Sequence, residues 1–413
     1  MATRRRREGI VGIFLLITAV LVDSAQARRK LASSNKSNDV EFAQAPRGTV
    51  KSVQSGGGDV VDCVDIYKQP AFDHPLLKNH TIQMKPSFTE EGESHLQGLP
   101  AELEEWGVDC PEGTVPIIRM TSENAVQKKD YVPPFPVNEK SGLHNKSFPV
   151  FASYNKGHEA CTFLYAIVKT IENGRTFHGG QALLNVWNPH AETGEASISQ
   201  IWIYAGSEEN VNTVEAGWIA GLDSRPTTTF FTYWTSDGYK STGCYNLRCS
   251  GFVQTNKHIA PGFQVRPTST FNGQQFEIGV QIKQDMSTQH WWLRLNDMDI
   301  GYWPSSIFNS LRDGGVGVDW GGEIHNFGKD WQHTTTQMGS GHFPRDGYFT
   351  KSSYIRNLAY IQNNGSMQST PKEDLVVYIT NPRCYDLVLG PSNLNFETHF
   401  YFGGPGFSAQ CII

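Results

Sequence analysis

Short stretches of alternating apolar and polar residues, each ended by a turn, recur along the second half of the chain. Examples are Ile198–Tyr204, which ends before Gly206, and Phe276–Ile282, which is followed by a turn and the run Trp291–Leu295. Alternation with a period of two is typical of strands with one buried face, and Gly, Asn and Asp between them favour antiparallel connections. We therefore predict an all-β fold of antiparallel sheets packed as a sandwich from about residue 148 onward.

Other all-β architectures share this pattern and stay open at this point. A barrel or a propeller is the alternative, although no repeat of blade length is present. Only residues 307–312 suggest a short helix. Aromatic residues make up 12% of the chain and glycines number 40, and both figures agree with an all-β protein.

The first residues direct the chain into the secretory pathway. Arg4–Arg7 form a basic segment, Ile10–Val22 an apolar run, and Ala25–Ala27 offers the small residues that a signal peptidase recognises. The apolar run is shorter than the roughly 20 residues of a membrane helix. We predict a signal peptide over residues 1–27 and a secreted protein with no membrane attachment, with an uncleaved anchor as the alternative.

A leader, a small module and a linker precede the predicted sandwich. Residues 28 to about 60 are polar and indicate a disordered leader, whereas Cys63 to Thr121 suggest a compact module with little regular structure. The linker that follows contains Val132–Pro136, whose prolines stop helices and central strands, and such linkers are where proteolysis concentrates. This order predicts a propeptide over residues 28–147 ahead of a domain over 148–413, and a two-domain protein with a stable hinge is the alternative.

Seven cysteines in an oxidising compartment leave one unpaired. Cys244 and Cys249 are close enough in sequence to join across a turn, and Cys161 is the best candidate for the odd one. Four sequons could accept N-linked glycans, at Asn35, Asn79, Asn145 and Asn364.

Composition and motif searches exclude several kinds of function. The net charge is −6 and no basic stripe follows the signal peptide, so we expect no nucleic-acid partner. The chain has no Gly-x-Ser-x-Gly, no phosphate-binding loop, no dinucleotide fingerprint and no zinc-helix spacing. Scattered histidines support a metal site only weakly, so we predict neither a metal nor a cofactor.

Two glutamates stand in surroundings that suit carboxylate chemistry. Glu215 shares its strand face with Gly217, and Glu323 shares its face with Gly321, because alternate residues of a strand point the same way. Small neighbours on that face leave room for a substrate to lie against the sheet. The competing interpretation is a solvent-facing glutamate, which is the usual fate of this residue type.

An ordered set of motifs around these glutamates resembles the neprosin family. The segments that carry the resemblance are Gln200–Trp202, Val214–Trp218, Tyr233–Tyr239, Thr242–Gln254, Trp291–Leu293, Ile300–Pro304, Trp320–Glu323, Cys384–Asp386 and Phe400–Pro405. Upstream, Asp62–Ile66 and Lys68–His80 resemble the activation peptide that precedes these enzymes. The resemblance covers about residues 60–413, nearly the whole mature chain.

Several expectations follow from the resemblance. Neprosins are plant secreted glutamic endopeptidases that cleave after proline, so it implies a peptidase of the apoplast, cell wall or vacuole that acts on proline-containing peptides. It implies two seven-stranded sheets with a concave cleft, and catalytic roles for Glu215 and Glu323. It also implies the disulfides Cys63–Cys110, Cys244–Cys249 and Cys384–Cys411, which leave Cys161 free.

A mechanism follows from two carboxylates in one site. Close carboxylates push one pKa up and the other down, so one glutamate can act as general base and the other as general acid at acidic pH. The candidates for contacting substrate are polar or aromatic residues near the motifs, with core positions as the alternative: Gln200, Trp202, Trp218, Tyr302, Trp303 and Trp320. A carbohydrate-active or carbohydrate-binding sandwich without peptidase activity is the competing function, because glycosidases also pair carboxylates.

Overall fold

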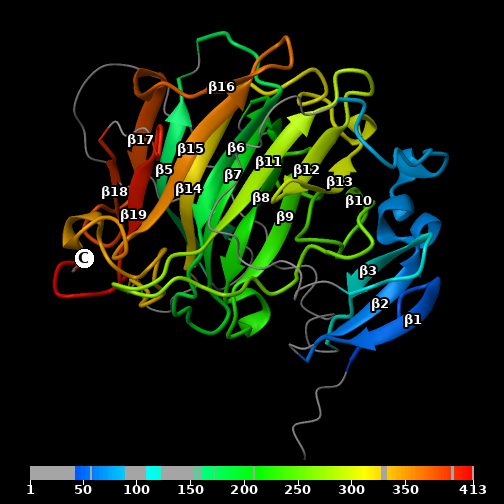
Figure 1. Cartoon of the computed structure of the whole chain (residues 1–413), viewed down its shortest axis with the longest axis horizontal. Helices are drawn as coiled ribbons and strands as arrows, with labels where there is room; N and C mark the ends of the chain where they lie inside the picture. Colours follow the sequence, from blue (N-terminus) through cyan, green and yellow to red (C-terminus); the bar gives the residue numbers. More distant parts are fainter. Residues whose placement is uncertain are drawn as a thin grey trace, which may run out of the picture.

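The computed structural model describes residues 42–55, 58–88, 108–121, 154–155, 160–171, 173–207, 210–326, 333–391 and 395–411. These residues form three antiparallel sheets (Figure 1). Two large sheets face each other, and the small third sheet lies beside one end of them, near β10 and β13. The predicted all-β sandwich is therefore confirmed.

The smaller of the two large sheets has seven strands in the described residues, in the order β17-β5-β14-β7-β8-β9 with β4 paired to β5. Its strands are β4 (Tyr154–Asn155), β5 (Ala160–Thr170), β7 (Ala196–Ala205), β8 (Asn212–Ala220), β9 (Thr229–Thr235), β14 (Gly317–Asn326) and β17 (Leu375–Ile379). We call it the seven-stranded sheet.

The other large sheet has nine strands in the described residues rather than the expected seven, in the order β10-β13-β12-β11-β6-β15-β19-β18 with β16 paired to β15. Its strands are β6 (Gly179–Asn185), β10 (Val253–Gln254), β11 (Glu277–Gln284), β12 (Trp291–Leu295), β13 (Met298–Trp303), β15 (Ser353–Ile361), β16 (Met367–Ser369), β18 (Asp386–Leu389) and β19 (Phe400–Gly403). Two strands of this sheet are very short, since β10 has two residues and β16 has three.

The main hydrophobic core lies between these two sheets. Trp218 on β8 and Trp320 on β14 are both fully buried there. Their indole N–H groups donate to backbone oxygens of Asn185 and Gln181 on β6, at 3.0 and 3.3 Å. A buried tryptophan needs such a partner for its polar atom. Because these two rings point into the core, alternate residues on the same strands point to the outer face of the seven-stranded sheet.

An N-terminal module precedes the sandwich, comprising the described residues between 42 and 121. It contains β1 (Thr49–Gln54), β2 (Val60–Asp65) and β3 (Thr114–Ile118), and three short 3-10 turns, η1 (Ile66–Lys68), η2 (Pro70–Asp73) and η3 (Pro75–Leu77). The expectation of a disordered leader to about residue 60 is wrong over β1, because Val60–Asp65 supplies a buried strand for β1 to pair with. The module also has more regular structure than its prolines suggested.

The other helical pieces among the described residues are single 3-10 turns. They are η6 (Leu222–Ser224), η7 (Ser305–Ile307), η9 (Pro344–Asp346) and η10 (Lys372–Asp374). The helix expected over residues 307–312 is replaced by η7, which Pro304 introduces as N-cap. No helix in the part of the chain that the structure describes is long and apolar enough to cross a bilayer.

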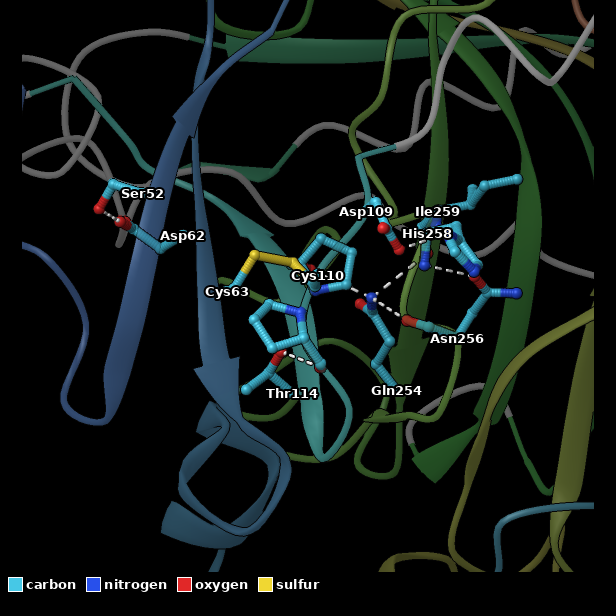
Figure 2. Close-up of a disulfide and its surroundings, with 12 residues drawn as sticks. Ser52, Asp62, Cys63, Asp109, Cys110, Thr114, Gln254, Asn256, His258 and Ile259 are labelled. Atoms are coloured by element: carbon cyan, nitrogen blue, oxygen red, sulfur yellow. Dashed lines mark hydrogen bonds and ion pairs between the residues drawn. A yellow bond between two sulfur atoms is a disulfide. The ribbon is translucent and has the colours of Figure 1, made fainter.

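Gln254 fastens the N-terminal module to the sandwich (Figure 2). Its backbone N–H donates to Gln69 Oε1 at 2.8 Å, and its side-chain amide donates to the backbone oxygen of Pro116 on β3 at 3.1 Å. The same amide also donates to backbone oxygens of Asn256 and Ile259. Both glutamines are about 1% exposed or less, so these hydrogen bonds are shielded from water. One buried residue thus joins the module to a loop of the sandwich.

Three disulfides join cysteines of the described residues. Cys63–Cys110 closes the N-terminal module (Figure 2), Cys244–Cys249 bridges a loop after β9, and Cys384–Cys411 ties down the C-terminal segment. These are the pairs that the family resemblance implied, so that prediction is confirmed. The side chain of Cys161 lies outside the described residues, and its free state stays a prediction.

Asp285, in the turn after β11, holds residues 83–87 of the N-terminal module, at the end of its described stretch 58–88. Its Oδ2 accepts from Gln83 Nε2 at 2.8 Å and from the backbone N–H of Ser87 at 2.7 Å. Burial alone would raise the pKa of Asp285, but the N–H of Ser87 and the Gln83 and Ser287 donors outweigh it and the pKa is lowered. The carboxylate is therefore the form that binds residues 83–87.

Replacing Asp285 by alanine is expected to open residues 83–87 to proteolysis. Hydrogen bonds to a charged acceptor contribute roughly 1.5–3 kcal/mol each, so we expect cleavage in this stretch to accelerate about tenfold or more. Limited proteolysis of the uncleaved chain, with fragments identified by mass spectrometry, measures this. Asp313→Ala, which removes an exposed carboxylate that binds Gln289 within the sandwich, is the matched control. Equal cleavage rates in the two variants would contradict the prediction.

Candidate active site

Glu215 and Glu323 lie on the outer face of the seven-stranded sheet, on the two strands that flank β7. Glu215 pairs with Trp202 of β7, and Glu323 pairs with Ile198 of the same strand. Paired residues in antiparallel strands share a face, so both glutamates stand on the same side of the sheet. The exposed fraction of each residue is 2%. Two carboxyl groups 108 positions apart in sequence are thus brought into one buried region.

Gln200 occupies the position between the two glutamates. On β7 it pairs with Gly217 of β8 on one side and with Gly321 of β14 on the other. Its side-chain Nε2 donates to Glu323 Oε2 at 2.8 Å. The two glycines predicted to make room on this face therefore flank a glutamine that binds one of the carboxylates.

The Glu215 carboxyl group accepts two hydroxyl donors. Thr213 Oγ1 donates to its Oε1 at 2.6 Å, and Tyr239 in the loop after β9 donates to the same oxygen at 2.7 Å. Burial raises the pKa of Glu215 to about 7, and the two hydroxyl groups oppose that rise. At acidic pH Glu215 therefore carries a proton.

The Glu323 carboxyl group has different neighbours. Besides Gln200 on Oε2, its Oε1 lies 2.8 Å from His325 Nε2, and Tyr165 on β5 donates to it at 3.5 Å, the outer limit for a hydrogen bond. Burial raises the pKa of Glu323, the charge of Glu215 raises it further, and Tyr165 and Gln200 act against both. The charge of Glu215 thus reaches Glu323, so an ionised Glu215 disfavours ionisation of Glu323.

Aromatic rings surround the pair. Tyr233 pairs with Glu215 across β8 and β9, and after burial the charges of Glu215, Asp237 and Glu323 each raise its pKa. Tyr245, in the loop closed by Cys244–Cys249, packs against Tyr233 with ring centroids 4.8 Å apart. The carboxyl groups thus lie in a low-polarity region bounded by phenol rings.

Of the six residues predicted to contact substrate, two lie on this face. Gln200 contacts Glu323, and Trp202 pairs with Glu215. The other four lie elsewhere. Trp218, Trp320 and Trp303 belong to the core between the sheets, and Tyr302 lies on the far side of the nine-stranded sheet, where His80 and Gln83 of the N-terminal module bind its hydroxyl group. The sequence argument erred for Trp218 and Trp320 because they are odd-numbered steps from the glutamates and so face the opposite way.

Four side chains around the carboxyl groups were not among the predicted site residues. Thr213 and His325 stand two residues from Glu215 and Glu323 on the same strands, so the strand period alone could have identified them. Tyr165 and Tyr239 come from β5 and from a loop. Only the strand register and the loop path bring them to the site, and neither is visible in the sequence.

Other predicted sites are distributed over the surface or lie outside the description. Asn79 and Asn364 are exposed, while Asn35 and Asn145 lie outside the described residues. In the described part of the chain, His333, Cys384 and Cys411 form one group of metal-type donors within 4.8 Å of one another. Both cysteines of this group are joined in a disulfide, so no thiolate is available to hold a metal.

Comparisons with known proteins address the family directly. Residues 193–405 match the family described as Neprosin, which is just over half of the chain, and residues 52–164 match the Neprosin activation peptide. The boundary at residue 147 between propeptide and catalytic domain stays a prediction.

Solved structures show only weak similarity. Scytalido-glutamic peptidase bound to a transition state analog inhibitor is 12% identical, covers 58% of this chain and 97% of its own, and has a TM-score of 0.33. SCP-B, of the Eqolisin family of peptidases, is 11% identical, covers 58% of this chain and 96% of its own, and has a TM-score of 0.29. The Emp46p carbohydrate recognition domain is 10% identical. The match covers 41% of this chain and 72% of the Emp46p chain, with a TM-score of 0.23. Similarity at this level supports no inference about this chain.

Proposed function

The chain belongs to the neprosin family, and on that premise we propose that it is a secreted glutamic endopeptidase, made as a proenzyme and active at acidic pH. Its substrates are peptides or proteins that contain proline, cleaved after that residue. The observation that carries the proposal is the pair of buried carboxyl groups, Glu215 and Glu323, on one face of a rigid sheet.

The neighbours of the two carboxyl groups support separate roles. Glu323 is bound by the side-chain nitrogen Nε2 of Gln200, an atom that can only donate and therefore favours a carboxylate. Glu215 is bound by the hydroxyl groups of Thr213 and Tyr239, which can either donate or accept and so tolerate a protonated acid. Glu323 is the general base that activates water, and Glu215 is the general acid that polarises the carbonyl and protonates the leaving amine.

Replacing Tyr239 by phenylalanine tests the role of Glu215. The hydroxyl group opposes the effect of burial on the pKa of Glu215, so its loss raises that pKa above about 7. Because the acid must be protonated to act, the alkaline limb of the pH–rate profile moves to higher pH, by about one unit for a hydrogen bond to a charged group. Steady-state rates from pH 4 to 9 measure the shift. If instead the acid limb moves to higher pH and the alkaline limb stays in place, Glu215 has the role of the base.

The outer face of the seven-stranded sheet, which carries Glu215 and Glu323, is called the catalytic face from here on. Its polar and aromatic residues are the candidates for substrate contact. Gln200 and Trp202 keep the role proposed from the sequence, and Trp202 packs in a cluster with Phe163, Tyr165 and Ile167. An aromatic face suits the flat apolar ring of proline. The preference for proline rests on this chemistry and on family membership.

The test of the function is peptide cleavage, followed by mass spectrometry, with protein freed of residues 28–147 and incubated from pH 3 to 7. The expected result is cleavage after proline with a maximum at acidic pH. A parallel incubation with cell-wall polysaccharides tests the competing function, a carbohydrate-active sandwich with the same two glutamates. Polysaccharide hydrolysis without peptide cleavage would favour that competitor, and no cleavage of either substrate would favour a binding protein.

The proenzyme state has its own test. Acidic residues of the propeptide, among them Glu102, Glu104 and Glu105, are proposed to hold it on the mature domain near neutral pH and to release it when protonated; they lie outside the described residues. The expected result is processing that accelerates as the pH falls from 7 to 4. A processing rate that stays constant over this range would exclude the mechanism.

A further inference from the structure

His325 is a buried histidine that forms a direct contact with one catalytic glutamate. It stands two residues after Glu323 on β14, and its Nε2 lies 2.8 Å from Glu323 Oε1. The exposed fraction of the His325 side chain is 0%. Phe163, its partner on β5, packs edge-on against the imidazole with centroids 4.9 Å apart and an interplanar angle of 68°. The ring is therefore fixed in position by both the strand register and an aromatic neighbour.

The hydrogen bond between His325 and Glu323 allows two proton arrangements. Burial lowers the pKa of His325 well below its usual value, so the ring is neutral and carries a single N–H. Either Nε2–H donates to an ionised Glu323, or a protonated Glu323 donates to a bare Nε2. The two arrangements differ in the charge of Glu323, which decides whether this glutamate can act as a base.

The other charged and titratable groups near Glu323 do not favour its carboxylate form. Burial and the charge of Glu215 both favour protonation, and the rings of Tyr165, Tyr233 and Tyr245 carry no positive charge. Among the described residues, Lys169 lies on this face and pairs with Asp319 at 3.5 Å, four residues before Glu323 on β14. Arg248, whose charge acts on Tyr245, is paired with Asp223. Apart from Gln200 and the distant Tyr165 hydroxyl group, His325 is the neighbour in the described structure positioned to donate to Glu323.

We propose that His325 is a positioning residue that donates its Nε2–H to Glu323 Oε1 and so keeps Glu323 ionised as the pH falls. The proposal rests on the proposed function, in which Glu323 is the general base. A donor to the carboxylate lowers the pH at which the base becomes protonated. The enzyme therefore retains activity at a lower pH than burial of the two carboxyl groups would otherwise permit.

The test compares two substitutions that differ in their ability to donate. His325→Leu removes the donor 2.8 Å from Glu323 Oε1 and leaves Gln200 on Oε2. The acid limb of the kcat/KM profile is then expected to move up by about one pH unit, which means a loss of about tenfold on that limb. His325→Gln supplies an amide N–H and is expected to keep the limb close to that of wild type. His178→Leu is the control, because it removes another buried histidine, bound to Gln284 in the nine-stranded sheet. It is expected to leave the profile in place.

The outcomes separate a positioning role from a structural one. A fall in kcat/KM of the same size at every pH, or a profile that coincides with wild type in His325→Leu, would overturn the proposal. A purely structural residue lowers the amount of active enzyme without moving the limb. An upward shift of the same size in His178→Leu would also overturn it, since the effect would then not depend on contact with Glu323.

A second measurement does not depend on activity. In protein labelled with nitrogen-15 at histidine, the proposal predicts a proton on His325 Nε2 between pH 5 and 7, with a resonance that moves in Glu323→Gln. A bare Nε2 would overturn the proposal. If the wild-type enzyme cleaves no peptide, the proposed function fails, and the imidazole resonance still decides where the proton lies.

Discussion

Replacing either Glu215 or Glu323 by glutamine is expected to lower the rate of peptide cleavage by about a thousandfold or more. Glutamine keeps the size of the side chain but can neither take a proton from water nor give one to the leaving amine. General acid–base catalysis and stabilisation of charge at the scissile carbonyl each contribute roughly two to four orders of magnitude. Because both carboxyl groups take part in one step, the double variant should lose little more than either single variant.

The effect of Glu215→Gln on folding stability depends on pH, and its direction follows from the pKa of Glu215. The pKa of Glu215 is raised to about 7 in the folded protein, whereas an unfolded glutamate titrates near 4.3. The stabilisation from its protonated form is thus fully present below about pH 4.3 and is lost as the pH rises through about 7. Glu215→Gln lacks this dependence, so its melting temperature should equal or exceed that of wild type at neutral pH.

A glutamate outside the site provides a control for the loss of activity in Glu215→Gln and Glu323→Gln. Glu195 is also a buried glutamate, and hydroxyl groups of Thr334 and Thr336 bind it away from the site. Glu195→Gln is expected to cleave peptides at nearly the wild-type rate. Rates are followed by mass spectrometry of a proline-containing peptide, and melting is followed by circular dichroism. Full activity in either site variant would mean that other residues carry the reaction or that a contaminating peptidase is present.

Gly217→Ala is expected to give the largest loss of stability among single changes on the catalytic face. A Cβ atom at this position would lie 2.0 Å from the backbone oxygen of Ser199 and 2.7 Å from the Cα of Gln200. Because both contacts are with the backbone of β7, no side-chain rotation can relieve them. Overpacking of this kind costs about 3 kcal/mol or somewhat more, which corresponds to a fall in melting temperature of about 6–12 °C.

The same substitution should also reduce activity, because the strand it displaces carries Gln200. That residue donates to Glu323, so a shift of β7 changes the geometry of the proposed base. Thermal unfolding and cleavage rates are measured together. Gly194→Asn is the control, since a Cβ there meets nothing within 4 Å and asparagine tolerates its left-handed backbone at φ +84°. A melting temperature unchanged in Gly217→Ala would show that the strands are not in close contact at this point.

The architecture and the two glutamates could be predicted because both leave a local trace in the sequence. Period-two alternation identifies strands such as Ile198–Tyr204, and the same period assigns Glu215 and Gly217 to one face. Close spacing indicated the Cys244–Cys249 disulfide, whereas the other two disulfides followed from the family resemblance. The family matches and the three observed disulfides agree with that resemblance.

The parts that could not be predicted depend on which strands become neighbours. Tyr165 reaches Glu323 only because β5 pairs with β14, a contact between residues 158 positions apart. Trp320 was misplaced for a different reason. Its aromatic character was given more weight than its position three residues before Glu323, an odd number of steps that turns its side chain into the core. A strict application of strand period would have removed it and would have added Thr213 and His325.

The disulfide Cys63–Cys110 has a consequence for how maturation must be observed. A chain cut anywhere between these two cysteines stays in one covalent piece, because the bond bridges 47 positions of sequence. Such a nick changes the band pattern on a denaturing gel only when a reductant is present. A cut after residue 121, by contrast, separates the N-terminal module from the sandwich with or without reduction. Denaturing gels with and without a reductant therefore distinguish two products. One is a precursor cut between the two cysteines, and the other is a sandwich no longer covalently joined to the N-terminal module.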